Sequence, residues 1–255
     1  MDIRFNAILK LATENLDLLF PPVCAICNDG LAGGGALCGR CGENLPRVCK
    51  PFCEVCGEGF DGQIEADFAC PNCRGGSFYF EFARAALVRS EAGLDLIHRF
   101  KYGQQVHLAG ELGRLACGAF EDERLAVAME ERWPLVPVPL HWRKLQERFF
   151  NQAEEIANVI GEIQGLAVEK RLKRIRQTET QTRLSRRERK VNLKGAFRVQ
   201  KPGFWQATDQ VDEAGLRGVI LIDDVFTTGS TVDECAKVLR KAGARRVVVI
   251  TVMRG

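Results

Sequence analysis

Two sets of side chains in this sequence are suited to bind ions. One is a series of four Cys-x2-Cys pairs between Cys24 and Cys73, and the other is the stretch VILIDDVFTTGST, Val219 to Thr231. Thiolates are ligands for soft metal ions, whereas carboxylates and hydroxyls beside a helix start suit a sugar phosphate. The two sets therefore predict two different kinds of site.

The cysteine pairs predict structural zinc. They are Cys24 and Cys27, Cys38 and Cys41, Cys53 and Cys56, and Cys70 and Cys73, with gaps of ten, eleven and thirteen residues. In a cytoplasmic chain thiols stay reduced, so this spacing favours metal over disulfides, with redox dithiols as the alternative. Two pairs complete a tetrahedral site, and four thiolates leave no open position for water or substrate. We expect two structural Zn²⁺ sites; sequential pairing is our first choice, and the spacing also allows crossed pairing.

The aspartate pair belongs to a predicted strand–loop–helix–strand unit. Residues 219–222 are all aliphatic, as in a strand buried on both faces of a parallel sheet. After the loop, apolar residues repeat at helical spacing, and the sequence RRVVVITV then supplies another buried strand. Such a unit places its loop at the carboxyl edge of the sheet, where open α/β folds bind ligands.

At that edge the residue types match a ribose phosphate. Carboxylates of Asp223 and Asp224 can accept hydrogen bonds from a sugar diol, and a helix start rich in hydroxyls suits phosphate. The loop residues are Thr227, Thr228, Gly229, Ser230 and Thr231. The loop lacks the Gly-Lys-Ser/Thr of a P-loop and the GxGxxG of a dinucleotide fold. A plain helix cap is the alternative, but it does not explain the adjacent carboxylates.

The stretch VILIDDVFTTGST resembles the motif with which type I phosphoribosyltransferases bind phosphoribosyl pyrophosphate (PRPP). The resemblance implies that Asp223 and Asp224 bind the ribose 2′ and 3′ hydroxyls and that Thr227 to Thr231 cradle the 5′-phosphate. It also implies Mg²⁺ bound together with PRPP.

A second anion site is expected on an earlier strand, for the pyrophosphate. The pattern of Leu135 to Val138 indicates a strand end. Four residues of the following loop are expected to be cationic: His141, Arg143, Lys144 and Arg148. Cations between a strand and a helix can stabilise a departing pyrophosphate. A solvated basic loop is the alternative.

Four segments in this order resemble the ComF family of competence-related proteins: the cysteine pairs, PVPLHWRKLQERFFNQAEEIA, RQTETQTRLSRRERKVNLKGAF and the PRPP motif. The resemblance carries over Arg148, Asn151, Gln152, Gln181, Arg189 and Asn192 as site residues. LIHRFKYGQ also resembles the family, and Lys101 within it is a candidate for contacting pyrophosphate. The catalytic candidates are Asp223, Asp224, Lys101 and Arg148. Where the family commonly has Arg-Gly-Phe-Asn-Gln, this chain has Phe149 in place of the glycine, so the backbone there is expected to differ.

The resemblance implies an α/β fold, a phosphoribosyltransferase-like parallel sheet flanked by helices after a small double zinc ribbon. Nine of the eleven cysteines lie before residue 78. We therefore predict an amphipathic helix at 1–20, zinc ribbons at 21–78 and the α/β domain at 79–255. Charged residues interrupt residues 1–20, so they lack the core of a signal peptide, and no apolar run is long enough to span a bilayer. A cytoplasmic chain without membrane insertion is expected.

The formal net charge of +3 conceals a basic segment at 170–194, which has eleven basic residues against Glu179 and Glu188. We expect this segment to be a lid over PRPP or a surface that binds nucleic-acid phosphates. A solvated charged face is the alternative.

Three functions fit these residues: PRPP-dependent glycosyl transfer, handling of single-stranded DNA, and PRPP sensing without catalysis. The resemblance favours a role in DNA uptake or processing, with PRPP, single-stranded DNA and helicase or channel components of DNA uptake as the expected partners. Whether this chain is a phosphoribosyltransferase, and which acceptor it would use, does not follow from these residues. We hypothesise that the zinc ribbons cover the site.

Overall fold

The computed structural model describes residues 21–31, 35–60, 62, 68–177, 186–200 and 218–255. The helix expected at 1–20 lies outside these residues. The chain divides into two compact units, Met1–Leu45 and Pro46–Gly255. The first unit contains the first two cysteine pairs, and the larger unit contains the other two together with the α/β domain. The division at residue 78 stays a prediction.

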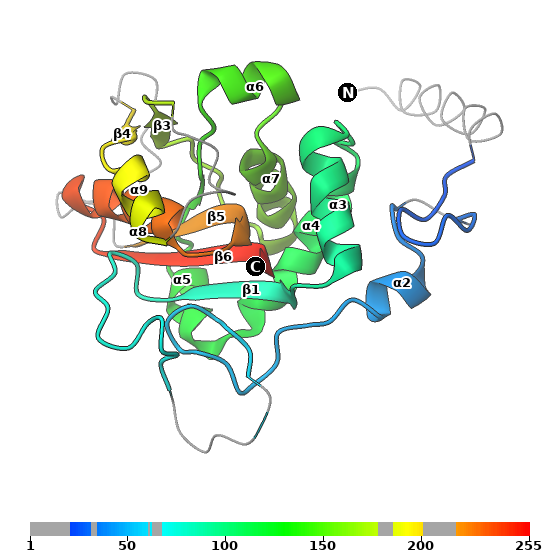
Figure 1. Cartoon of the computed structure of the whole chain (residues 1–255), viewed down its shortest axis with the longest axis horizontal. Helices are drawn as coiled ribbons and strands as arrows, with labels where there is room; N and C mark the ends of the chain where they lie inside the picture. Colours follow the sequence, from blue (N-terminus) through cyan, green and yellow to red (C-terminus); the bar gives the residue numbers. More distant parts are fainter. Residues whose placement is uncertain (1–20, 32–34, 61, 63–67, 178–185, 201–217) are drawn as a thin grey trace. The chain divides into compact units, whose positions relative to one another are not determined.

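The larger unit is built on a parallel sheet with the strand order β1-β6-β5-β2 (Figure 1). Its strands are β1 (Ala83–Val88), β2 (Leu135–Pro137), β5 (Gly218–Phe226) and β6 (Arg246–Arg254). The aliphatic runs in β5 and β6 are buried, as their sequences predict. β5 continues through Asp223 and Asp224 to Phe226, so both aspartates lie within the strand and not after it.

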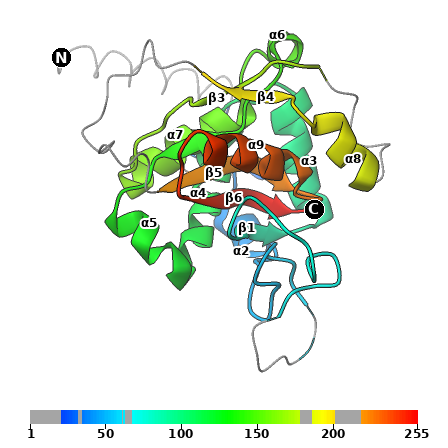
Figure 2. The same ribbon diagram turned by 90° about the vertical axis from the view of Figure 1, so that its left-hand side faces the viewer.

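Helices pack on both faces of this sheet (Figure 2). The described helices of the larger unit are α3 (Glu91–Tyr102), α4 (Leu108–Cys117), α5 (Ala126–Glu130), α6 (Trp142–Arg148), α7 (Gln152–Gln164), α8 (Arg186–Leu193) and α9 (Ser230–Lys241), with short 3-10 turns at Gly118–Glu121 and Glu123–Leu125. Of these, α4, α5, α7 and α9 contact the strands of the sheet. Among the helices of the described residues, none combines the length and the apolar sequence that crossing a bilayer requires.

Alternation along β5 assigns the two faces. Val219 and Leu221 share an apolar cluster with residues of α9, including Cys235. Because successive strand residues point to opposite sides, Ile220 and Ile222 face the other side. Helices α4 and α7 pack against each other and against the strands, and at Gly113 of α4 a Cβ would lie 2.5 Å from the Val159 side chain. The chain therefore has the expected α/β fold, a parallel sheet between layers of helices.

A small antiparallel sheet stands apart from the main one. It pairs β3 (Leu172–Arg174) with β4 (Phe197–Val199). The basic segment at 170–194 thus contributes β3 and α8, while residues 178–185 lie outside the described part of the chain.

The second cysteine module is part of the larger unit's core. Cys53, Cys56, Cys70 and Cys73 are buried in the same apolar cluster as Leu221. Arg84 of β1, which is 3% exposed, forms an ion pair with Glu54 of this module at 3.1 Å between Nη2 and Oε2. The module is therefore fixed to the sheet by apolar and ionic contacts.

Candidate functional site

Asp223 and Asp224 stand at the carboxyl end of β5. Asp223 is half-buried and Asp224 is 8% exposed. The Asp224 backbone N–H donates to Asp223 Oδ1 at 2.9 Å. Val138 N–H donates to Ile222 O at 2.9 Å, so the loop after β2 begins beside the aspartates. The two predicted halves of the site therefore meet at one sheet edge.

Lys101 lies beside this pair, although more than a hundred residues separate it from them in the sequence. It is in the last turn of α3, and its Nζ lies 2.7 Å from Asp224 Oδ2. The Lys101 side chain is 20% exposed and that of Asp224 is 11% exposed. An ion pair shielded to this degree is screened less by salt than a surface pair.

Asp223 is the group whose titration the site perturbs most clearly. Burial, and after it the neighbouring Asp224 carboxylate, raise its pKa from 3.8 to about 7, while Lys101 opposes the shift. Two carboxylates this close do not both ionise freely, so the Lys101 cation is needed for the pair to carry its full charge. A hydrogen bond donated by a ligand hydroxyl would act in the same direction.

The hydroxyl loop joins β5 to α9. Gly229 has φ +76°, and a Cβ at this position would lie 2.6 Å from Cζ of the Phe226 ring. Glycine is thus required both by the backbone angle and by the close approach. The N-cap residue Gly229 offers no side chain, but the Ser230 N–H donates to Thr228 Oγ1 at 3.4 Å, and Thr228 Oγ1 lies 3.0 Å from Ser230 Oγ. Backbone amides and hydroxyls at this helix start can bind an anion.

The opposite side of the site is formed by α6 and the start of α7. Arg148 Nη1 donates to Gln152 Oε1 at 3.0 Å, and Asn151 Nδ2 donates to Val138 O at 3.1 Å. The Arg148 guanidinium also lies 4.8 Å from the centre of the Tyr102 ring. These contacts fix the orientation of Arg148, Asn151 and Gln152 beside the aspartates.

Phe149 takes the backbone conformation that a glycine would take. Its φ is +66° and its side chain is 77% exposed, so it ends α6 in the left-handed region. We expected the backbone to differ where Phe149 replaces the glycine that is common in the ComF family. The structure does not support this expectation, because the backbone angle is one that glycine commonly takes. An exposed side chain is tolerated in this conformation at a cost in free energy.

One cleft of about 640 Å³ brings most of the predicted site residues together. The predicted residues in its wall are Lys101, Lys144, Arg148, Asn151, Gln152, Asp223, Asp224, Thr227, Gly229 and Thr231. Among the described residues, none from the second cysteine module lines this cleft. Described residues of that module instead meet Phe226, Thr227 and Arg254, next to the loop. The hypothesis that the zinc ribbons cover the site stays a prediction.

Other predicted residues lie elsewhere. Arg143 is exposed, and its Nη1 donates to Gln177 Oε1 at 2.8 Å. Asn192, at the end of α8, is half-buried, and its carbonyl accepts from Arg176 Nη2 at 2.7 Å. Gln181 and the side chain of Arg189 lie outside the described residues.

The expectation that His141 is a cation is wrong. His141 is 6% exposed and starts α6, where its Nδ1 accepts from the Arg143 backbone N–H at 3.4 Å. An accepting Nδ1 carries no proton in this arrangement. Burial lowers its pKa, and the charges of Arg174, Arg143 and Lys144 lower it further. His141 is thus a neutral helix cap.

Arg174 is a cleft residue that the sequence did not single out. It ends β3, lines the cleft and interacts with the charge of Asp223, although burial lowers its pKa. His98 and Tyr102, with ring centres 4.9 Å apart, also line the cleft. Arg174 is one of eleven basic residues in its segment, and no sequence pattern separates it from its neighbour Lys173, which lies in the same strand but does not line the cleft.

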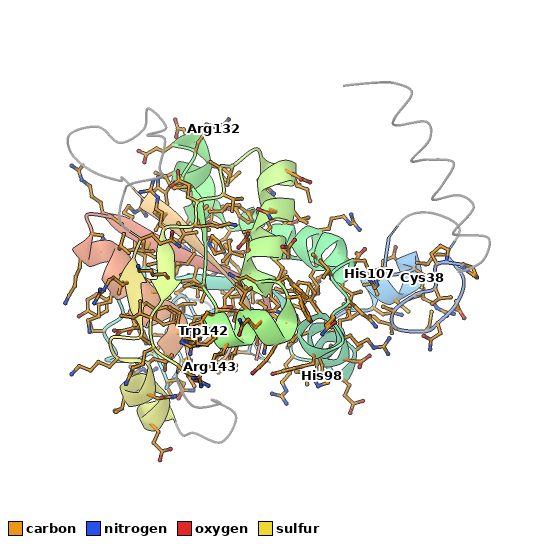
Figure 3. All side chains as sticks on the ribbon, turned by 90° about the horizontal axis from the view of Figure 1, so that it is seen from above. Cys38, His98, His107, Arg132, Trp142 and Arg143 are labelled. Atoms are coloured by element: carbon orange, nitrogen blue, oxygen red, sulfur yellow. The ribbon has the colours of Figure 1, made fainter. Side chains whose placement is uncertain are left out.

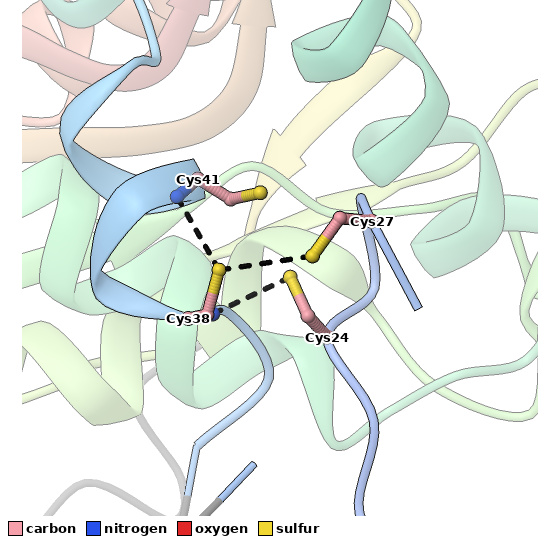
Figure 4. Close-up of side chains that lie close together, drawn as sticks. All are labelled: Cys24, Cys27, Cys38 and Cys41. Carbon is pink, nitrogen blue, oxygen red and sulfur yellow. Dashed lines mark hydrogen bonds between the residues drawn. The ribbon is translucent and has the colours of Figure 1, made fainter. Parts of the chain in front are cut away.

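The cysteines form two separate groups of four, and the pairing is sequential. Within each group all sulfurs lie within 4.8 Å of one another. Cys27 and Cys38, shown in Figure 4, have their sulfurs 3.8 Å apart, as do Cys56 and Cys70. Sulfurs at tetrahedral corners around zinc are about 3.8 Å apart, given Zn–S bonds of about 2.3 Å.

The two cysteine modules are also built alike. Cys38 N–H donates to Cys24 Sγ at 3.3 Å, and Cys70 N–H donates to Cys53 Sγ at 3.2 Å. The first module adds a short helix, α2 (Gly39–Glu43). Both groups consist of four sulfurs, so both fit closed structural zinc sites.

Comparisons with known proteins agree with this arrangement. A family model described as a double zinc ribbon domain matches residues 15–74. The chain is 33% identical over 155 residues to competence protein F of Haemophilus influenzae, and 34% identical over 155 residues to DNA utilization protein YhgH of Escherichia coli K12. It is 25% identical over 171 residues to competence protein ComFC of Streptococcus pneumoniae.

These matches cover only part of each protein. The first two include 60% of this chain and 64% and 63% of the relatives, and the third includes 67% of both chains. The chain thus spans just under two thirds of the length of the first two relatives.

Proposed function

We propose that the chain is a ComF-family protein, that it binds Mg²⁺–PRPP in the cleft at the end of β5, and that it acts in the uptake or processing of DNA; its similarity to competence protein F, YhgH and ComFC supports the family assignment. The observation that carries the ligand assignment is the meeting of an aspartate pair, a glycine-containing hydroxyl loop and a cationic wall in one cleft. The relatives' names, competence protein and DNA utilization protein, support the biological role.

In this proposal the parts of PRPP have separate contacts. The ribose hydroxyls donate to Asp223 and Asp224, and the 5′-phosphate accepts from the amides and hydroxyls of the loop at Gly229. The pyrophosphate lies towards Lys144 and Arg148, where fixed cations stabilise its charge. Lys101, which holds Asp224 at 2.7 Å, is close enough to stabilise charge on either side.

Glycosyl transfer is the activity we propose for this cleft. The bond between ribose C1′ and the pyrophosphate oxygen breaks, pyrophosphate leaves with the electron pair, and an acceptor nucleophile bonds to C1′. The fixed cations of the wall would stabilise the charge that develops on the leaving group. Sensing of PRPP without turnover is the alternative.

A second role, contact with single-stranded DNA, is favoured by the surface around the cleft. Tyr102 is 59% exposed and Trp142 is 56% exposed, and both are paired with arginines. Figure 3 shows Trp142 and Arg143 together on α6, with His98 on α3. Exposed rings among cations suit stacked bases and backbone phosphates.

Pyrophosphate release distinguishes transfer from sensing. Wild-type protein incubated with Mg²⁺–PRPP and a panel of nucleobases and amines should release pyrophosphate, and D223N/D224N should reduce the rate by roughly a hundredfold or more. Binding of PRPP with no release from any acceptor would support the sensor and contradict transfer.

Binding to DNA is tested separately. Single-stranded binding should weaken with salt, and charge reversal at Arg186, Arg187 and Arg189 or replacement of Trp142 by alanine should reduce it. D223N/D224N serves as the matched control, since it alters the PRPP site and leaves these residues intact. Equal DNA binding by all variants would contradict this role.

A further inference from the structure

Arg254, the last residue of β6, lies between the hydroxyl loop and the second cysteine cluster. Its side chain is 9% exposed. One end of the guanidinium, Nη1, donates to Phe226 O at 2.9 Å and to Thr227 O at 3.0 Å. It also donates to the carbonyl of Gly255. Phe226 ends β5, Thr227 is the first residue of the hydroxyl loop, and Gly255 follows β6.

The other end of the same guanidinium faces the cysteine module. Nη2 lies 3.8 Å from Cys56 Sγ and forms an ion pair with Glu58. The N–H donors of a planar guanidinium are fixed relative to one another. If the cysteine module shifts the Nη2 end, the Nη1 donors that face the loop carbonyls therefore turn with it. Among the described residues Arg254 Nε has no hydrogen-bond partner, so the orientation is set by the Nη groups and by the Phe226 ring, whose centre lies 5.1 Å from the guanidinium carbon.

An apolar path runs beside this polar one. Phe80, which follows the cysteine module, packs edge-to-face on Phe226 with ring centres 6.0 Å apart. Phe226 in turn lies under Gly229, where a Cβ would be 2.6 Å from its ring. Tyr79 N–H donates to Asp233 Oδ1 in the first turn of α9 at 2.7 Å. The segment that directly follows the module thus contacts Phe226 below the loop and the helix that follows the loop.

We propose that Arg254 is a positioning residue through which metal binding at Cys53, Cys56, Cys70 and Cys73 fixes the hydroxyl loop for its phosphate. Four thiolates around one divalent cation leave net negative charge, which a guanidinium beside Cys56 offsets. When the cluster loses its metal, the four cysteines are no longer held together and the module loosens. Arg254 then loses its partners, and the Phe226 and Thr227 carbonyls lose a fixed donor.

The coupling is reciprocal, since linkage requires that a ligand favoured by the metal-loaded protein also favours metal retention. Only the identity of the ligand, PRPP, rests on the proposed function. The coupling itself is measurable without any ligand, from the hydrogen exchange of the loop amides.

The experiment compares zinc-loaded wild-type protein with R254M, R254K, E58Q and R246M. Arg246 is the matched control because it is on the same strand but forms its ion pair with Glu81, at 2.7 Å. Amides of residues 227–231 should exchange roughly tenfold faster in R254M and measurably faster in E58Q, with R246M unchanged. R254K keeps the charge without the fork and should be intermediate.

Ligand and metal measurements complete the test. Affinity for Mg²⁺–PRPP should fall roughly tenfold in R254M, and PRPP should slow the release of one zinc ion to a chelator in wild type but not in R254M. Glu58, 40% exposed, provides a variant that keeps the fold if R254M does not. Loop exchange in E58Q and R254M equal to that of R246M would overturn the coupling. If wild type binds no PRPP, the proposed function fails, while the exchange comparison still decides the coupling.

Discussion

The chemistry of the cleft depends on how three charged side chains share one partly buried space. Lys101 balances Asp224, and Asp223 is left with a pKa raised to about 7 by burial and by its neighbour. A proton on Asp223 removes one of the acceptors that a ribose diol needs. Binding in this cleft should therefore respond to pH near neutrality.

We predict that affinity for ribose 5-phosphate rises between pH 6 and pH 8, because Asp223 ionises in that range. In D223N the part of the pH dependence that comes from Asp223 should disappear. Any pH dependence that remains then comes from ionisation of the ligand's phosphate. K101M removes the cation that lowers the Asp223 pKa, so its midpoint should move to higher pH. Calorimetric titration of the three proteins across pH is the measurement, and identical profiles would contradict the assignment.

Folding stability should show the opposite dependence. The raised pKa means that the folded chain keeps a proton on Asp223 that the unfolded chain has released above pH 3.8. Stability is therefore expected to fall as pH rises from about 4 to about 7, and to be insensitive to Asp223 above that range. Denaturant unfolding of wild type and D223N across these pH values measures the difference.

Phe149 gives a prediction about backbone strain. Its φ of +66° is costly for a residue with a Cβ, and its exposed ring contributes little packing. F149G should stabilise the protein by about 1 kcal/mol, as judged by denaturant midpoints. A glycine that destabilised the chain would show that the ring makes contacts worth more than the strain.

The sequence identified the cleft residues on β5 and the hydroxyl loop more fully than those on the opposite wall. Asp223, Asp224 and Gly229 are close together in the chain, so one motif identifies them all. Lys101 was named only through family resemblance, because its proximity to Asp224 depends on how α3 folds back over the sheet edge. His141 was misassigned since no sequence pattern shows that a histidine is buried as a helix cap.

In the proposed site, the turn from β5 into α9 is the element that binds the 5′-phosphate. G229A would force a Cβ against the Phe226 ring from a left-handed backbone, with an expected cost of about 1–3 kcal/mol and roughly tenfold or greater loss of ribose 5-phosphate affinity. Gly243, with φ +104° and no atom within 4 Å of the place where a Cβ would lie, is the control. G243A should lose stability without losing affinity; a similar affinity loss in both would refute a specific role for Gly229.

The elements themselves were largely predictable. Continuous aliphatic runs identified β5 and β6, and helical spacing identified α7 and α9, because burial on one or two faces leaves a clear pattern. The strand order β1-β6-β5-β2 and the β3–β4 pair were not predicted, since pairing depends on contacts between distant segments. β5 also extends to Phe226, past the boundary that the aspartates suggested, because its pairing with β6 continues as far as Phe226 and Arg254.

Across the molecule, the two cysteine modules are alike in sequence but belong to different compact units. From the cysteine positions we predicted that both modules form one domain. Cysteine spacing could not show otherwise, because it carries no information about the surface against which each module packs. C56S should therefore reduce zinc content from two ions to one and lower the melting temperature of the α/β unit by roughly 5 °C or more. C27S should remove one zinc ion and leave that transition unchanged; a matching loss in both variants would contradict separate roles.

The central claim is that the cleft at the end of β5 is a PRPP site, and calorimetric titration with Mg²⁺–PRPP tests it most directly. Wild type should bind one PRPP per chain, and D223N/D224N, folded and zinc-loaded, should bind roughly a hundredfold more weakly. Absence of binding to wild type, or equal affinity in the double variant, would contradict the assignment of this site.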